Sequence, residues 1–364
     1  MIQSSAAADP AAGKPASAIS TPPVSATLVR CFGWCMLGVL AGYLINMLLS
    51  NAGGWPGVGS LLGDGFSVLA LLQGLVYALA IVLAVLFVLR QRDLPLRRDS
   101  ARISAFNGWL VRSAFFAVLF VGLGDAILSF VRIEGMLDGL VGEELGTQLG
   151  RSQYRGQFFH LPLMVLGVVV ACFTRTLGFV WLTLMIVAAE LLIVISRFVF
   201  SYEQAFMGDL VRFWYAALFL FASAYTLVEE GHVRVDVFYA GYARRTKGWI
   251  NAFGSVFLGM TLCWTILLVG LGSRSSIIYA PIRSFETSQS GYGMYVKYLM
   301  AGFLAVFAIT MLIQFVSYLM AAVADILDGD PEPAPVPTTD ARDGAPQGDP
   351  SSGSEPRIDT VPAG

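Results

Sequence analysis

The stretch LMIVAAELLIVIS, residues 184–196, holds one charged side chain, Glu190, among aliphatic residues. Similar apolar stretches recur along the chain, in which 56% of the 364 residues are hydrophobic and only 13% are charged. Soluble domains contain about 25% charged residues, so lipid is the solvent that suits most of this chain. The sequence therefore predicts an integral membrane protein.

Eight apolar runs are long enough, or nearly so, to cross a bilayer as helices. A hydrocarbon core of ~30 Å needs about 20 helical residues at ~1.5 Å each. We therefore predict an all-α, polytopic fold of about eight transmembrane helices. A break around Arg175 divides the fourth run from the fifth and predicts a tight helical hairpin there. The runs cover residues 28–50, 66–89, 109–131, 158–174, 177–200, 210–228, 250–272 and 298–326.

Basic residues near the span ends predict the orientation, because they favour the cytoplasmic side. The second loop, residues 90–102, contains five arginines, and the sixth loop contains Arg234, Arg244, Arg245 and Lys247. The first and fifth loops contain no basic residue. Both termini are therefore expected in the cytoplasm, although the third and seventh loops would face outward with some basic residues.

The two ends of the chain differ in composition from the apolar middle. Residues 1–26 are rich in Ala, Ser and Pro, and no secretory signal peptide is expected because the first apolar run is too long for one. Residues 329–364 hold eight of the sixteen prolines and seven acidic residues. Such segments bury too little apolar surface to offset their ordering entropy, so both are predicted to be disordered.

Two acidic residues, Asp125 and Glu190, lie inside predicted spans, where a charge costs roughly 2.5–3.5 kcal/mol on insertion scales. A functional interpretation makes them proton or cation ligands. A structural interpretation pairs each with a polar group on a neighbouring helix or subunit, or leaves it protonated. We favour the structural one, because neither has a second acid at i±3 or i±4. Arg197, two turns after Glu190, is expected to extend to the outer interface.

Histidine and cysteine positions favour neither a metal site nor a cofactor. The only two histidines are His160, at the start of the fourth span, and His232, in the sixth loop. A whole membrane would separate them, so they cannot both ligate one haem iron. His160 is expected at the outer interface. Cys31 and Cys35 lack a matching second pair and are expected to be buried thiols.

The sequence EEGHVRVDVFY, residues 229–239, gathers several polar groups between the sixth and seventh spans. Gly231 suits a helix C-terminal cap. An extended strand would place His232, Arg234 and Asp236 on one side, whereas a helix would pair His232 with Asp236 at i, i+4. No nucleophile stands beside a base here, so we predict a hydrogen-bonded turn and no catalytic residue.

Four features follow one another along residues 177–326: an arginine–aromatic pair, an acidic outer loop, a G-H-x-R-V-D loop, and an E-x-S segment before a lysine-headed last span. The residues at these places are Arg197-Phe198, Asp209, Gly231, His232, Arg234, Val235, Asp236, Glu286, Ser288, Lys297 and Gln314. With these features, the second half of the chain resembles the DctQ-type small membrane subunit of TRAP transporters (tripartite ATP-independent periplasmic transporters).

The resemblance implies a division of labour among three proteins. A periplasmic substrate-binding protein captures a solute, usually an organic acid, and a large permease subunit carries it with sodium across the bilayer. The small subunit would be a non-enzymatic scaffold for the large one in a bacterial inner membrane. Two alternatives stay open: a self-contained carrier or channel, and a membrane anchor subunit of a redox enzyme.

We accordingly predict four regions and two groups of interface residues. The regions are a disordered segment (1–26), an extra membrane region of about four helices (27–176), a DctQ-like four-helix core (177–328) and an acidic, proline-rich tail (329–364). The resemblance implies outer contacts at Arg197, Asp209, Glu286, Ser288 and Lys297, and an inner turn organised by Gly231, His232, Arg234 and Asp236.

Overall fold

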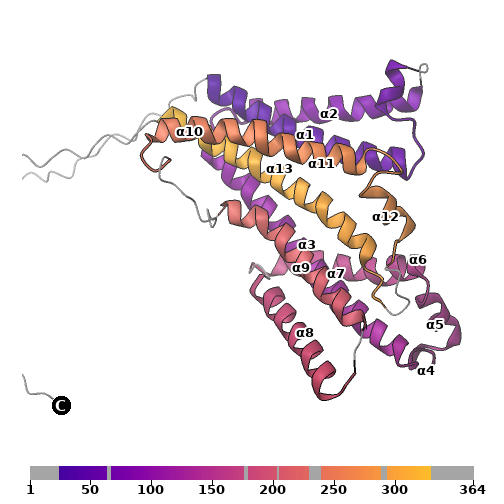
Figure 1. The fold of residues 1–364 in the computed structure, drawn as a ribbon. Helices are drawn as coiled ribbons and strands as arrows, with labels where there is room; N and C mark the ends of the chain where they lie inside the picture. The colour runs from indigo at the N-terminus through magenta and orange to yellow at the C-terminus, as the bar shows by residue number, and fades with distance from the viewer. Residues whose placement is uncertain are drawn as a thin grey trace, which may run out of the picture. The chain divides into compact units, whose positions relative to one another are not determined.

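A computed structural model describes residues 24–63, 67–175, 179–202, 205–228, 239–287 and 293–328. Within these ranges all regular structure is helical, and eight helical segments are long and apolar enough to cross a membrane (Figure 1). This confirms the predicted all-α fold with eight candidate spans. The elements are α1 (Val24–Asn51), η1 (Val58–Leu62), α2 (Val68–Arg90), α3 (Leu96–Ile133), α4 (Leu137–Val141), α5 (Glu143–Leu149), α6 (Ser152–Arg155), η2 (Gly156–His160), α7 (Leu161–Phe173), α8 (Phe179–Val199), α9 (Ala205–Val228), α10 (Arg244–Phe253), η3 (Gly254–Met260), α11 (Thr261–Leu271), α12 (Tyr279–Ser284) and α13 (Lys297–Asp328).

Several helices extend beyond the apolar runs that predicted them. α3 begins directly after Pro95 and has 38 residues, so its first turns include much of the arginine-rich stretch expected to be a loop. At ~1.5 Å per residue it is about 57 Å long, well over the hydrocarbon thickness. The fourth span likewise begins at Ser152, and the seventh at Arg244. Hydropathy marks only the part of a helix that lies in lipid, so these polar turns were missed.

The predicted hairpin of the fourth and fifth spans is wrong in its packing. The helices are separate, as expected, because Thr174 and Arg175 are not helical. However, α7 packs against α3, whereas the main neighbour of α8 among the described elements is α9. Chain order therefore did not decide which helices are neighbours here.

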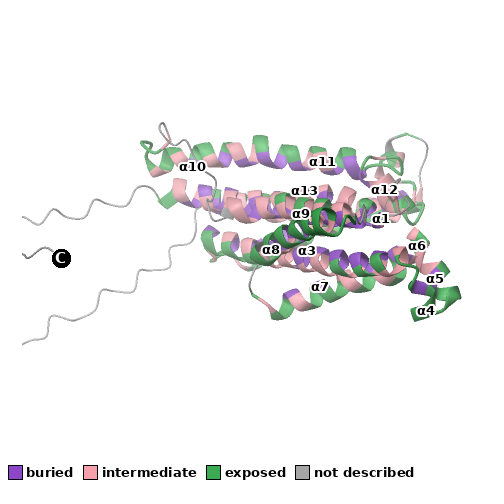
Figure 2. Ribbon diagram, turned by 60° about the horizontal axis from the view of Figure 1, so that its bottom comes forward, coloured by how far each residue is buried: buried purple, intermediate pink, exposed green. Residues whose placement is uncertain are grey.

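The last helix, α13, occupies the centre of the bundle. It packs against α1, α3, α9, α10, α11 and α12. One apolar core joins it to α1 and α11, and a second joins it to α3, α8 and α9. Buried residues accordingly run along α3 and α13, while exposed residues predominate on α8 (Figure 2).

Ion pairs show that α13 runs antiparallel to α3 and to the seventh span, and that the fourth span runs antiparallel to α3. Arg97 of α3 pairs with Asp325 near the end of α13, and Arg244 at the start of α10 pairs with the same carboxylate. At the opposite end, Asp125 of α3 pairs with Arg155 before α7. We refer to these as the Arg97 end and the Asp125 end. Which end faces the cytoplasm stays a prediction.

We predict that Gly167→Ala destabilises the fold. A Cβ atom at Gly167 of α7 would lie 2.4 Å from the backbone nitrogen of Ala117 on α3. Because a backbone atom cannot rotate away, the two helices must separate, and overpacking of this kind costs about 1–3 kcal/mol. The measurement is the Tm of the purified chain in detergent, which should fall by several degrees.

Gly108→Ala is the matched control, because a Cβ at this α3 position meets no atom within 4 Å. Alanine favours a helix over glycine by up to ~1 kcal/mol, so the Tm of this variant should stay the same or rise. Equal Tm values for the two variants would contradict the close approach of α3 and α7.

Candidate functional site

A buried polar cluster at the Asp125 end joins α3 to the start of the fourth span and to α13. We call it the Asp125 cluster; its members are Asp125, Arg155, His160, Tyr295 and Tyr298. Oδ1 of Asp125 lies 2.5 Å from Nε of Arg155 and 2.7 Å from Nε2 of His160. Its Oδ2 accepts a hydrogen bond from the backbone N–H of Tyr295 at 3.0 Å. Both oxygens of a fully buried carboxylate are therefore occupied.

Arg155 and His160 connect the carboxylate to further groups. Arg155, whose side chain is also fully buried, donates through Nη2 to the backbone carbonyl of Asp125 at 3.0 Å and to Ser129 at 2.8 Å. Its guanidinium carbon lies 4.7 Å from the centre of the Tyr295 ring. Nδ1 of His160 lies 2.8 Å from the hydroxyl of Tyr298. The ion pair between Asp125 and Arg155 is thus held by partners that come before α8 in the chain and by partners that come after α12.

The structure corrects the expectation that His160 is an interfacial residue. Its side chain is completely buried, because the π-helical segment η2 turns it toward Asp125 and Tyr298. Gly156 in the same segment lets the chain approach the end of α12, since a Cβ there would lie 2.4 Å from the ring of Phe285, the residue after α12. A histidine 35 residues from its carboxylate carries no spacing signal, so sequence reasoning could not find this pair.

A second set of polar contacts lines the α3–α13 interface toward the Arg97 end. Asn107 donates through Nδ2 to Oε1 of Gln314 at 3.1 Å and to the backbone carbonyl of Thr310 at 3.0 Å. Nε2 of Gln314 donates to Oγ of Ser104 at 2.9 Å, and the hydroxyls of Ser100 and Ser317 lie 2.9 Å apart. We call these contacts the α3–α13 seam: Ser100, Ser104, Asn107, Thr310, Gln314 and Ser317.

The seam ends in an ion-pair network. Nη2 of Arg97 lies 2.6 Å from Oδ1 of Asp325 and 2.9 Å from Oδ2 of Asp328, and Arg244 reaches Asp325 at 2.7 Å. A further pair, fully buried, holds α1 to α3, with Nε of Arg30 2.6 Å from Oδ2 of Asp99. The arginines that predict orientation therefore also connect helices.

The predicted outer residues make modest contacts. Lys297 pairs with Glu286 at 2.6 Å in a half-exposed position, and Asp209 accepts a hydrogen bond from the backbone N–H of Met294 at 3.1 Å. Arg197 is exposed on the last turn of α8. These contacts place Lys297, Glu286 and Asp209 at the Asp125 end but bring none of them into one cluster with Arg197.

Five other predicted site residues lie outside the described ranges. They are Gly231, His232, Arg234, Asp236 and Ser288.

The two intramembrane acids, Asp125 and Glu190, differ in whether they have a partner within the described part of the chain. Asp125 has the neighbouring-helix partners that the structural interpretation expects. Glu190 is exposed on α8 and makes no hydrogen bond or ion pair with another residue in the described part of the chain. Pairing inside this chain thus accounts for Asp125 alone.

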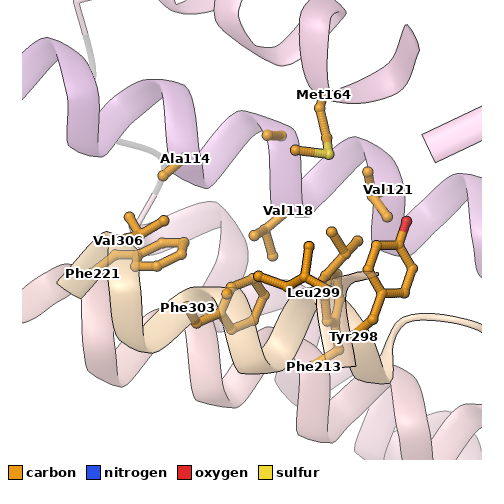
Figure 3. Close-up of a pocket in the computed structure, with 13 residues that line it drawn as sticks. Ala114, Val118, Val121, Met164, Phe213, Phe221, Tyr298, Leu299, Phe303 and Val306 are labelled. Atoms are coloured by element: carbon orange, nitrogen blue, oxygen red, sulfur yellow. The ribbon is translucent and has the colours of Figure 1, made fainter. Parts of the chain in front are cut away.

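One cavity is lined almost entirely by apolar side chains. It has a volume of about 250 Å³ and lies between α3, α7, α9 and α13, with Val118, Met164, Phe213, Leu299 and Phe303 in its wall (Figure 3). Tyr298 supplies its one labelled polar group. Among the described residues, no group of three or more His, Cys, Asp or Glu side chains could hold a metal ion. Such a lining offers little to an organic anion.

Eight apolar helices joined by buried polar contacts define a multi-pass α-helical membrane protein. Residues 184–321 match the family model described as "Tripartite ATP-independent periplasmic transporters, DctQ component". This part of the chain is therefore a DctQ domain, which indicates a TRAP transporter small permease subunit and confirms the resemblance. DctQ is a transporter component and not an enzyme family. A search of curated proteins and a search of solved structures found no match.

The match assigns the buried polar contacts to a boundary between two regions. The DctQ domain spans α8 to α13, whereas α1 to α7 precede it. Asp125, Arg155 and His160 belong to the preceding region, and Tyr295 and Tyr298 belong to the domain. The α3–α13 seam crosses the same boundary. The Asp125 cluster and the α3–α13 seam therefore dock the N-terminal helices onto the DctQ domain.

We predict that Arg155→Leu strongly destabilises the chain. The substitution leaves the buried Asp125 carboxylate without its permanent countercharge, and breaking a buried pair typically costs 3–5 kcal/mol. The Tm in detergent should fall clearly. Arg155→Leu combined with Asp125→Leu should recover part of the loss, because no unpaired charge remains.

Lys297→Ala serves as the comparison, because its pair with Glu286 is partly exposed and such pairs contribute about 0–1 kcal/mol. If Arg155→Leu lowered Tm no more than Lys297→Ala, the Asp125 cluster would not have the structural role assigned to it.

We also predict that cysteines at Ser100 and Ser317 form a disulfide. Their hydroxyls lie 2.9 Å apart, so the sulfurs can meet with little backbone movement. The four native cysteines would first be replaced by alanine, and a protease site would be inserted after Gly241, between α9 and α10. After oxidation and cleavage, the two fragments should stay joined on a non-reducing gel and separate on reduction.

The control pairs Ser100→Cys with Ser284→Cys of α12, which lies at the opposite end of the bundle. Its fragments should separate in both gels. Separation of the Ser100–Ser317 fragments without reduction would rule out the antiparallel α3–α13 register.

Proposed function

We propose that this protein is the small membrane subunit of a TRAP transporter and that it supports the large permease subunit during sodium-coupled uptake of an organic acid or a similar solute. A periplasmic substrate-binding protein would deliver the solute. The complex would lie in a bacterial inner membrane, with both termini of this chain in the cytoplasm. The observation that carries the proposal is the DctQ match over residues 184–321.

The chemistry of the described residues supports a bracing role. The buried charged side chains, Arg30, Asp99, Asp125 and Arg155, are paired with one another between helices. The apolar cavity between α3, α7, α9 and α13 is lined by aliphatic and aromatic side chains and has no charged group for a carboxylate or a sodium ion. Charged side chains that are paired between helices hold those helices together and do not form a pathway for a charged solute.

The N-terminal helices fit the same proposal. They cover α9 and α13 through α1 and α3, whereas α8 packs mainly on α9. The N-terminal helices thus cover one side of the DctQ domain, and α8, on another side, remains accessible to a partner subunit. We infer that the added spans stiffen the domain that contacts the permease, because they make polar contacts with both ends of α13.

The test is reconstitution of the three proteins in proteoliposomes. Labelled mono- and dicarboxylates would be chosen by whether they raise the Tm of the binding protein. We expect sodium-driven uptake only when this chain, the large permease and the binding protein are all present. Omitting this chain should abolish or strongly reduce uptake and lower recovery of folded permease, because the permease loses its brace.

Two control measurements address the alternative functions. Solute accumulation by this chain alone would show a self-contained carrier and overturn the proposal. A visible absorption spectrum from a bound redox group in the purified chain would instead favour an anchor subunit of a redox enzyme.

A further inference from the structure

One exposed stripe of α8 has the composition of a protein interface and not of a lipid-facing surface. Thr183, Val187, Glu190, Val194 and Arg197 are all exposed and follow one another at alternating steps of four and three residues. This spacing places them on one face of the helix. The polar members recur every seven residues, with a valine between each pair. We call this set the Glu190 stripe.

The Glu190 stripe is distinct from the side of α8 that packs inside the chain. Leu182, Ile186 and Ala189 face α9 and are buried. At 3.6 residues per turn, the stripe lies roughly a quarter turn around the helix from them. A second helix could therefore lie along α8 without displacing α9.

The helix α2, which is also largely exposed, differs from α8 in where its polar side chain points. α2 and α8 are the least buried of the eight candidate spans. On α2 the polar Gln73 points inward, is completely buried and donates to the hydroxyl of Ser50 at 2.8 Å. Its exposed face is aliphatic, with residues such as Leu79, Val82 and Leu86. α8 departs from this pattern by directing an acidic residue outward.

An outward acid at mid-span needs a partner. Glu190 lies eleven residues after the start of α8 and nine before its end, so it cannot reach an interface by extending along the helix. A charged residue at that depth is costly, because hydrocarbon does not solvate it. The same chain offsets this cost at Asp125 with two side-chain partners and a backbone N–H. No described residue does so for Glu190.

We propose that the Glu190 stripe binds a transmembrane helix of the large permease subunit and that Glu190 accepts a hydrogen bond from a basic or other donor side chain of that helix. The proposal rests on the proposed function. The alternating spacing of three and four residues suits packing at a small crossing angle, in which the valines fit between side chains of the partner. Arg197 would reach a carboxylate or carbonyl of the partner near the end of the helix.

Charge complementarity selects this partner over a second copy of the chain. Two copies inserted in the same direction and related by a two-fold axis along the membrane normal would bring identical stripes together. Glu190 would then face Glu190, and Arg197 would face Arg197, at the same depth. Like charges at a desolvated contact are unfavourable, so the stripe fits a helix of different sequence.

The test is co-purification from membranes that contain this full-length chain and an affinity-tagged large permease subunit. We expect Glu190→Leu to lower the amount of this chain recovered per permease by about tenfold, because an intramembrane hydrogen bond contributes about 1–2 kcal/mol in peptides. Val187→Trp and Val194→Trp should cause a similar loss by filling the space of the partner helix. Glu190→Gln, which keeps an acceptor, should retain more binding than Glu190→Leu.

Val82→Trp on α2 is the matched control. Val82 is 51% exposed, close to the 58% of Val187 and the 49% of Val194, but it lies on the aliphatic face. It should co-purify like the unmodified chain. When purified without the permease, the α8 variants should have the same Tm as the unmodified chain, because the stripe contributes little to packing inside the chain.

The outcomes separate this inference from the proposed function. If the unmodified chain binds the permease and the Glu190 and valine variants bind equally well, the stripe is not the contact and the inference fails while the proposed function stands. If the unmodified chain does not bind the permease, both fail. If the variants instead abolish self-association of the purified chain, the stripe is a homodimer contact and the inference is wrong.

Discussion

The packing of α3 along α13 is the contact on which the arrangement of the described helices depends. α13 is the central helix of the DctQ domain, and α3 belongs to the region that precedes the domain. Serine, asparagine and glutamine side chains pair between the two helices, and polar pairs of this kind gain stability in lipid because water cannot compete for them. They also fix the register, because a shift of one turn would leave several polar groups unpaired.

The Asp125 cluster completes this docking at the other end of the same helix pair. A buried ion pair is costly to form, because two charges lose their solvation. In return it is selective, since only one placement of the fourth span and of α13 satisfies the carboxylate, the guanidinium and the imidazole together. The paired polar groups between the helices therefore make the assembly of this chain specific.

The surfaces of the DctQ domain differ in whether their polar side chains are paired within the chain. Where the N-terminal helices cover the domain, its polar side chains are paired within the chain. Where α8 is uncovered, an acid remains on the surface at mid-span. A membrane subunit that acts by binding another subunit is expected to have one such surface, and the preceding helices leave it accessible.

The sequence by itself determined the fold class, the number of spans and the family, because apolar length and a local motif depend only on neighbouring residues. It also showed that neither Asp125 nor Glu190 has a second acid at i±3 or i±4. Only the tertiary structure decided that Asp125 meets Arg155 and His160, that α8 packs on α9 and not on α7, and that Glu190 faces outward. These outcomes depend on which helices become neighbours, and side-chain fit and hydrogen bonding between distant segments decide this without leaving a periodic signal in the chain.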